Sequence, residues 1–343
     1  MFSHLIPEVN ADLKRTKKAI ISLGCSFVQG HGALDEQIYR NYKWVWTWDQ
    51  NSPLWNLSDE DKVRLVQEYP DIIIHPQPPI NFSNHENNNS FVNVLCKKYF
   101  GGEYTPINLG RSGNGNRATI KDLYFYPDIL WDEIEETIVI YCPSGMERMD
   151  FMDDSEVSHI NNHPRWITAW PSEVDGGKGA RNQLWSGIKM AVDSERFEIL
   201  EQIAHVQELM LWCKYKKAKL IIVPAFMQHV YTRKRFIQTL SARCIRNSDR
   251  SLSEVIPEGL RGDSSIRKLV DLWPWESMFY PDDCPSFADY SLQQEFGHWE
   301  KAQYFYTYVG KGSPDLWISP CGHPTKKAHD AFAKKLYERI LSM

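Results

Sequence analysis

Several features that define large classes of protein are missing from this sequence. The 343 residues contain no long uncharged apolar stretch, and the mean hydropathy is −0.47, so we expect no membrane-spanning helix. The apolar stretch that follows the first basic residues is too short for the hydrophobic region of a secretory signal peptide. The sequence therefore predicts a protein that is neither secreted nor inserted in a membrane.

Closely paired metal ligands are also missing. The seven cysteines are scattered, at positions such as Cys25, Cys96 and Cys142, without the spacing of a zinc site or a redox motif, and we interpret them as reduced thiols. The histidines include no helix pair at ligand spacing, so we expect no metal. The glycines within residues 110–116 do not follow the order of the dinucleotide fingerprint, and we expect no cofactor.

The sequence also lacks an excess of positive charge. The formal net charge is −5 at pH 7, which gives no general attraction for phosphate backbones, so we expect no nucleic-acid partner. Hydrophobic residues make up 42% of the chain and charged residues 24%, which is typical of a globular protein with a sizeable core. We expect a single domain over residues 1–343 that carries large insertions.

Apolar runs of strand length alternate with amphipathic stretches of helix length, which predicts an α/β fold. Two segments interrupt the alternation, at about residues 31–89 and 228–311, where prolines and aromatic residues are frequent. We interpret both as insertions, and the first has a loop composition that includes the polar run 85–89. We expect strands at 19–23, 105–109, 137–141 and 220–226, and helices at 90–100, from 117, at 195–219 and at 325–341.

A serine and a histidine near opposite ends of the sequence are the strongest candidates for chemistry. The apolar run 19–23 ends at Gly24 and is followed by Ser26, as expected where the carboxyl end of a strand opens into a turn. The functional residues of α/β sheets lie at this edge. His323 lies just before the last predicted helix, so folding must bring it to Ser26 for the two to act as nucleophile and base. Alternatively, both residues only cap helices.

Three short blocks of the sequence resemble those of the SGNH hydrolase superfamily, also called GDSL esterases. Residues 24–27 are similar to the first block, with Cys25 in place of the usual aspartate, residues 108–113 to the second, and residues 322–324 to the last. The resemblance implies a flavodoxin-like three-layer α/β/α parallel sheet and a serine ester hydrolase that needs no cofactor. It further implies that the serine attacks an ester carbonyl and that the histidine takes its proton.

The resemblance also implies an oxyanion hole, formed by the backbone N–H groups of Ser26 and Gly113. A glycine at position 113 lets the backbone approach a substrate, although a glycine in such a loop can equally serve only the turn. The family's oxyanion asparagine is replaced here, and Ser144 is the residue at the matching position. Asn114 or Asn116, on the neighbouring loop, can also donate a hydrogen bond to the site.

The residue that orients the histidine in the family is missing from its usual place. An aspartate there precedes the histidine by three positions, and this sequence has Pro320 instead. Asp315 is the nearest acidic candidate, and a loop over residues 316–322 can return its carboxylate to the ring of His323. Without an acid, the serine-protease template predicts a turnover that is lower by about ten-thousandfold.

Three tryptophans alternate in the first insertion, at Trp44, Trp46 and Trp48, so an extended strand would place their rings on one face. Such a face is either a sugar-binding platform or a packed cap over the core. Together with the resemblance, the tryptophans favour a carbohydrate ester, such as an O-acetylated glycan, as the small-molecule or glycan substrate.

A second hypothesis keeps the fold without the catalysis. Large aromatic insertions in a sequence without a signal peptide are similar to those of phage-encoded relatives. We therefore expect the protein in the cytoplasm or in a virion. The chain is then a catalytically impaired binding or structural protein, for instance a virion component that holds a glycan. The sequence leaves the oligomeric state open.

Overall fold

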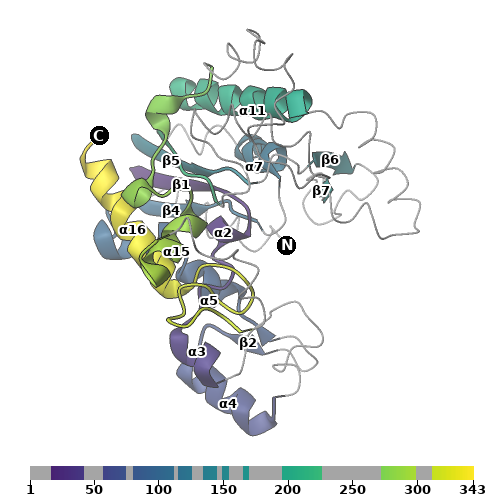
Figure 1. The fold of residues 1–343 in the computed structure, drawn as a ribbon, viewed down its shortest axis with the longest axis vertical. Coiled ribbons are helices and arrows are strands. Elements are labelled where there is room, and N and C mark those ends of the chain that lie inside the picture. The colour runs from purple at the N-terminus through teal and green to yellow at the C-terminus, as the bar shows by residue number, and fades with distance from the viewer. Residues whose placement is uncertain are drawn as a thin grey trace.

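The computed structural model contains a four-stranded parallel sheet with helices on both faces (Figure 1). The strands are β1 (Lys18–Gly24), β4 (Thr105–Asn108), β5 (Glu136–Cys142) and β8 (Lys219–Ile222), in the order β4-β1-β5-β8. The three strand pairs are all parallel, which confirms the α/β class. The structure describes residues 17–41, 57–74, 80–111, 115–125, 134–144, 149–153, 165–169, 195–225, 272–298 and 311–343.

Strand β1 lies inside the sheet because both of its faces are apolar. Ile21 and Leu23 belong to the core on one face of the sheet, and Ile20 belongs to the core on the other. A strand that is buried on both faces has a near-continuous apolar sequence, as β1 has apart from Lys18 and Ser22. The chain leaves β1 for β4 on one side and then crosses to β5 on the other, and α/β folds hold their ligands at the carboxyl end of such a strand.

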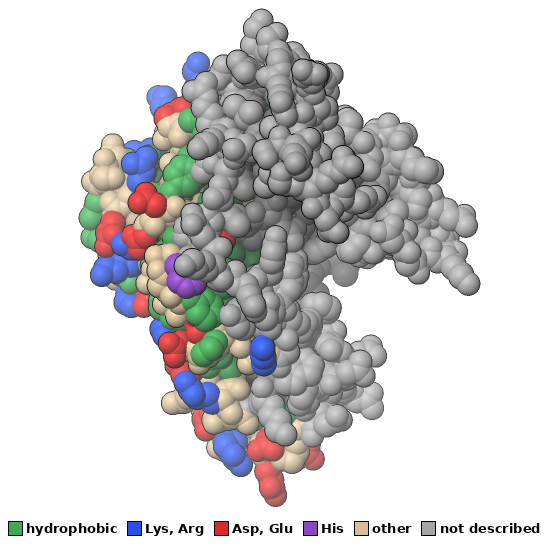
Figure 2. Space-filling view, in the orientation of Figure 1, with side chains coloured by type: hydrophobic (Ala, Val, Ile, Leu, Met, Phe, Trp, Pro, Cys, Tyr) green, Lys and Arg blue, Asp and Glu red, His purple; other side chains and the backbone are tan. Residues whose placement is uncertain are grey.

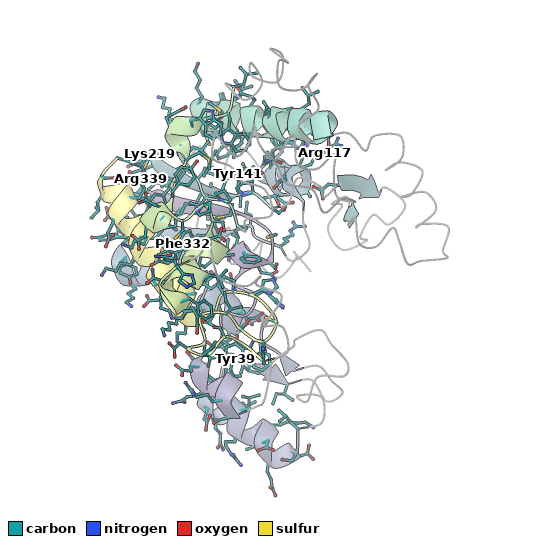
Figure 3. All side chains as sticks on the ribbon, in the orientation of Figure 1. Tyr39, Arg117, Tyr141, Lys219, Phe332 and Arg339 are labelled. Carbon is teal, nitrogen blue, oxygen red and sulfur yellow. The ribbon has the colours of Figure 1, made fainter. Side chains whose placement is uncertain are left out.

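Two groups of helices cover the two faces of the sheet. One face packs against α7 (Asn116–Lys121) and α11 (Glu195–Tyr215), and the other against α6 (Phe91–Val94) and α16 (Lys326–Leu341). Figure 3 shows Tyr141 of β5 beneath α11, and Phe332 on α16. A two-stranded antiparallel sheet of β6 (Met149–Asp153) and β7 (Arg165–Ala169) lies beside α7. The Asp150 carboxylate accepts hydrogen bonds from the N–H groups of Gly115 (3.0 Å) and Ala118 (2.9 Å) at the start of α7.

Each strand and each helix that the sequence predicts has a counterpart in this core. The helix expected over residues 90–100 begins as α6 and continues as a π-helical turn, η2 (Leu95–Tyr99). Within the described residues, α7 is followed by a 3-10 turn, η3 (Asp122–Phe125). The described cysteines are all free thiols, as expected. The predicted alternation of strands and helices is therefore confirmed for the core.

The first insertion is more regular than its loop composition suggests. Within residues 31–89 the structure has helices α3 (Glu36–Asn41), α4 (Asp59–Glu68) and α5 (Ser83–Asn88) and the short strands β2 (Ile73–Ile74) and β3 (Ile80–Asn81). Residues 85–88 of the polar run predicted as a loop lie in α5. His85 and Glu86 are buried there, and Asp35 lies 3.3 Å from Nε2 of His85. A small core stabilises this region, formed by Leu34, Ile38, Tyr39, Leu65, Tyr69, Ile72 and Phe82 (Tyr39 in Figure 3).

The described part of the second insertion packs on the sheet. It contains two 3-10 turns, η5 (Trp275–Ser277) and η6 (Pro281–Asp283), and the helix α15 (Phe287–Phe296). Met278 forms a parallel bridge with Ile222 at the edge of β8, and Phe287 stacks on Phe332 with 4.2 Å between ring centroids. The prolines and aromatic residues of this segment therefore belong in part to the core.

The surface of the described residues carries charges of both signs. In Figure 2, Lys and Arg side chains are interspersed with Asp and Glu side chains on the described part of this face. Among the helices that the structure describes, none has the length and apolar character needed to cross a membrane.

The buried histidine of α16 makes stability depend on pH. Burial lowers the pKa of His329 to about 3, and its Nδ1 accepts the N–H of Phe91 at 3.1 Å, so the folded protein holds the ring neutral. The unfolded chain binds a proton near pH 6.5, so the free energy of unfolding should fall by about 1.4 kcal/mol per pH unit below that pH, and level off near pH 3. Urea unfolding at several pH values between 7.5 and 4.5 measures this slope.

The matched control for this pH effect is His329→Gln, which keeps a polar side chain of similar size and does not titrate. Other groups, such as His205, titrate equally in both proteins, so the difference between the two slopes reports position 329 alone. Equal slopes in the two proteins would show that His329 is not held neutral in the folded state.

Candidate active site

A tight turn at the carboxyl end of β1 positions Ser26. The strand ends at Gly24, and Ser26 is the first residue of the short helix α2 (Ser26–Gln29). A Cβ at position 24 would lie 2.3 Å from Cγ2 of Val28, so the turn closes this tightly only with glycine. Because Ser26 begins a helix, its N–H has no acceptor within that helix and can face a ligand. The serine side chain thus stands at the edge of the sheet where α/β proteins bind ligands.

A hydrogen-bonded turn before α16 positions His323. The N–H of Ser319 donates to the carbonyl of His323 at 2.8 Å, and the N–H of His323 donates to Oγ of Ser319 at 3.2 Å. Gly322 has a φ of 79°, a left-handed conformation that favours glycine, and its N–H donates to the Ser319 carbonyl at 2.8 Å. The turn is therefore closed by its own hydrogen bonds and fixes the backbone of His323.

The structure brings together the two residues that the sequence analysis paired. Nε2 of His323 lies 2.7 Å from Oγ of Ser26, although the residues are 297 positions apart in the chain. The ring of Phe27 packs beside the imidazole with 5.0 Å between centroids. Ser26 is 7% exposed and His323 is half-buried, so the pair lies at the surface of the core and not inside it. This distance is within the hydrogen-bond reach that a general base requires.

The second ring nitrogen of His323 is bonded to the backbone. Its Nδ1 lies 3.1 Å from the carbonyl oxygen of Cys321. Because a carbonyl only accepts hydrogen bonds, Nδ1 carries the hydrogen and Nε2 presents a lone pair to Ser26. The imidazole is thus held in the tautomer that a general base needs, and the partner of Nδ1 within the described part of the chain is a neutral carbonyl.

Asp315 lies away from this ring. Its side chain is exposed, its N–H donates to Oε1 of Glu295 at 2.7 Å, and its carbonyl accepts from Lys327 at 3.3 Å. The loop expected to return the carboxylate to His323 instead folds into the closed turn described above. In this arrangement Cys321, and not Asp315, orients the imidazole.

Asn116 and Ser144 form a buried network at the end of β5. The Asn116 amide donates to the carbonyl of Ser144 at 3.1 Å and to Oε1 of Gln202 at 2.7 Å. Its carbonyl oxygen accepts from the N–H of Ser144 at 2.7 Å and from the Tyr141 hydroxyl at 3.1 Å. Both amide hydrogens of Asn116 are therefore engaged, and its side chain links β5 to α11. The Ser144 hydroxyl donates to Oδ1 of Asn116 at 3.3 Å.

The other residues of the predicted site lie outside the described residues. These are the oxyanion candidates Gly113 and Asn114 and the proposed sugar platform of Trp44, Trp46 and Trp48. Their roles stay predictions.

The second sequence block has a structural role that the sequence analysis missed. The Asn108 amide donates to the carbonyl of Val28 at 3.0 Å, and its Oδ1 accepts the N–H of Gly110 at 3.0 Å. A Cβ at position 110 would lie 2.4 Å from the backbone nitrogen of Gln29. Asn108 and Gly110 therefore hold α2, and with it Ser26, against the end of β4.

A second group of polar residues, also missed by the sequence analysis, lies beside the Ser26–His323 pair. The ring of His31 contacts that of His323 edge-on with 4.7 Å between centroids, and its Nδ1 lies 3.6 Å from Oε2 of Glu86. Burial alone would lower the pKa of His31, but Glu86 and Cys321 outweigh it and hold this pKa well above the usual value. No spacing rule links positions 31, 86 and 321. The one signal in the sequence was that His31 follows the candidate nucleophile Ser26 by five positions, which indicated that it could lie near the site.

Comparison with known proteins does not assign this site. No protein-family model matches the sequence, and a search of curated proteins finds no similar chain. The function of the site is therefore inferred from its residues and their geometry.

Proposed function

We propose that this protein is a serine ester hydrolase of the SGNH type, with Ser26 as nucleophile and His323 as general base. The observation that carries the proposal is the 2.7 Å distance between Nε2 of His323 and Oγ of Ser26. Three sequence blocks that resemble the superfamily support it. The strand order β4-β1-β5-β8 also supports it, since in chain order it reads 2-1-3-4, as in the first four strands of flavodoxin-like sheets.

The reaction would proceed through an acyl-enzyme. Oγ of Ser26 attacks the ester carbonyl carbon while its proton passes to Nε2 of His323, and we expect the N–H groups of Ser26 and Gly113 to bind the oxyanion. The imidazolium then protonates the leaving alcohol as the ester C–O bond breaks. Water attacks the acyl-enzyme, His323 takes its proton, and the proton returns to Ser26 as the acid leaves.

The carbonyl of Cys321, which orients the imidazole of His323, determines the turnover that we expect. In the serine-protease template, replacing the aspartate by an amide lowers turnover by about ten-thousandfold because the histidine takes the wrong tautomer. Here the carbonyl preserves the correct tautomer and lacks only the negative charge that stabilises the imidazolium. We therefore expect an enzyme slower than those with a triad and far faster than uncatalysed hydrolysis.

We further propose that the substrate is a short-chain ester of carbohydrate type, such as an O-acetylated glycan. The tryptophans of the first insertion and the analogy with the superfamily support this class, and a cytoplasmic or virion-associated location would suit it. No cofactor takes part in the proposed reaction.

A catalytically impaired glycan-binding or structural protein is the second candidate. The observation that favours it is the use of the Asn116 amide by Ser144 and Gln202, which takes one expected oxyanion donor away from the site. Loss of one such donor typically costs about a hundredfold or more in turnover.

The experiment that tests the proposal combines labelling with kinetics. Wild-type protein is expected to hydrolyse a short-chain aryl ester and to react with a serine-directed phosphonate at Ser26, identified by peptide mass spectrometry. Ser26→Ala is expected to lose both properties, since the attacking oxygen is gone. Ser342→Ala, at an exposed serine, is the matched control and should behave as wild type.

Two results would decide against ester hydrolysis with Ser26 as the nucleophile. One is equal hydrolysis by wild-type protein and Ser26→Ala. The other is wild-type protein that binds an acetylated glycan without turnover and binds it equally well as Ser26→Ala, which would favour the binding protein.

A further inference from the structure

Three side chains beside Ser26 offer a set of ligand atoms suited to a divalent transition metal. His31, Cys321 and His323 each present one ligand atom, and these atoms all lie within 4.8 Å of one another. His31 and Cys321 are buried, and His323 is half-buried. Thiolate and imidazole ligands in a four-coordinate arrangement are those that Zn²⁺ prefers.

Both histidines have the outer partners that metal-bound histidines usually have. A histidine that binds a metal through one ring nitrogen typically donates its other N–H to a carboxylate or to a backbone carbonyl. Nδ1 of His31 lies 3.6 Å from the Glu86 carboxylate, and Nδ1 of His323 lies 3.1 Å from the carbonyl of Cys321. With Nδ1 of each ring at its outer partner, Nε2 would be the atom that binds the metal.

The backbone is built to bring the cluster together. Gly32 has a φ of 82°, and a Cβ there would lie 2.7 Å from Oγ of Ser319 and 3.0 Å from Sγ of Cys321. Glycine at this position lets the segment that carries His31 meet the turn that carries the other two ligands. The N–H of Gly32 also donates to Oε1 of Glu86 at 2.9 Å, which fixes the carboxylate beside His31.

We propose that His31, Cys321 and His323 form a Zn²⁺ site and that bound zinc switches off the Ser26–His323 pair. Binding converts the Cys321 thiol to a thiolate, and the proton goes to solvent. Nε2 of His323 exchanges its hydrogen bond with Ser26 for the metal, so it can no longer take the serine proton. Water or the Ser26 hydroxyl completes the coordination. The binding itself does not depend on ester hydrolysis.

Cobalt provides a readout that is independent of activity. Full-length protein freed of metal by a chelator is titrated with Co²⁺ alone, and we expect one Co²⁺ per chain with a thiolate-to-cobalt charge-transfer band. Cys321→Ser should lose this band, and Glu86→Gln should weaken binding by about 10- to 100-fold through the outer partner of His31. Cys213→Ala, which removes a buried thiol in α11, is the matched control and should keep the band.

A second measurement uses the wild-type protein, so it does not depend on the folding of a variant. Zinc should slow the alkylation of Cys321 by iodoacetamide by about tenfold or more, because a metal-bound thiolate is a poor nucleophile. Wild-type protein without a charge-transfer band, a band retained in Cys321→Ser, or alkylation of Cys321 unaffected by zinc would each overturn the proposal.

Measurements of ester hydrolysis distinguish a failure of the zinc proposal from a failure of the proposed hydrolysis. If the chain hydrolyses esters, zinc should inhibit wild-type protein at concentrations that leave the residual activity of Cys321→Ser unaffected. Inhibition that is equal in the two proteins would overturn the switch. If the chain hydrolyses no ester, the cobalt and alkylation results still decide whether the metal site exists.

Discussion

Replacing His323 with glutamine is expected to lower kcat/KM for a short-chain aryl ester by about four to six orders of magnitude. Nε2 of His323 lies 2.7 Å from Oγ of Ser26 and is the proposed general base. In serine hydrolases with this arrangement, loss of the histidine removes most of the chemical acceleration, and binding and the oxyanion hole supply the remainder. Steady-state kinetics of wild-type and variant protein measure the ratio.

The control for this prediction is His298→Gln, because His298 is an exposed histidine just after α15 and outside the site. Its kcat/KM should equal that of wild type. Activity of His323→Gln within about tenfold of wild type would mean that His323 is not the base, since general acid–base catalysis alone contributes more than that.

The positions of Ser26 and His323 at the ends of secondary-structure elements were predictable from local signals, whereas their pairing was predicted from the resemblance to the superfamily. An apolar run that ends in glycine and is followed by serine marks the carboxyl end of a strand, and the structure places β1 and α2 there. The histidine lies just before a long amphipathic helix, α16. Both signals come from residue patterns within one strand or one helix, and such patterns can be read from a single sequence.

The orientation of His323 was not predictable, because it depends on how one turn folds. The sequence offered Asp315 as the nearest acidic residue to orient the ring. The turn closes through Ser319 and leaves Asp315 exposed, so a backbone carbonyl takes the place expected for a carboxylate. A backbone acceptor has no residue signature, and only the structure can reveal it.

The cluster of His31, Glu86 and Cys321 was hidden for a related reason. Clusters of polar residues are recognised in a sequence by short spacings, whereas these three residues come from separate parts of the chain. Glu86 stands in a polar run whose composition predicts a loop, yet the run forms α5 because its buried side chains find polar partners. Tertiary contacts here override the local preference.

The substitution Gly110→Ala is expected to lower the free energy of unfolding by about 2–3 kcal/mol and to reduce ester hydrolysis as well. An added Cβ would lie 2.4 Å from the backbone nitrogen of Gln29 and 2.7 Å from the backbone carbon of Val28. These backbone atoms cannot rotate away as a side chain can, so the end of β4 and α2 must separate, at a cost typical of overpacking. Because Ser26 begins α2, its Oγ moves relative to His323, and small displacements of reacting groups cost about a hundredfold in rate.

Urea unfolding and ester kinetics on the same preparations test both parts of this prediction, with Gly101→Ala as the matched control. A Cβ at Gly101 meets no atom within 4 Å, but φ is 60°, so the control should lose about 1–2 kcal/mol through backbone strain and keep its activity. Gly110 is not among the residues with positive φ, so its loss has to come from the contact with α2. Full activity in a folded Gly110→Ala would show that the packing of β4 against α2 does not position Ser26.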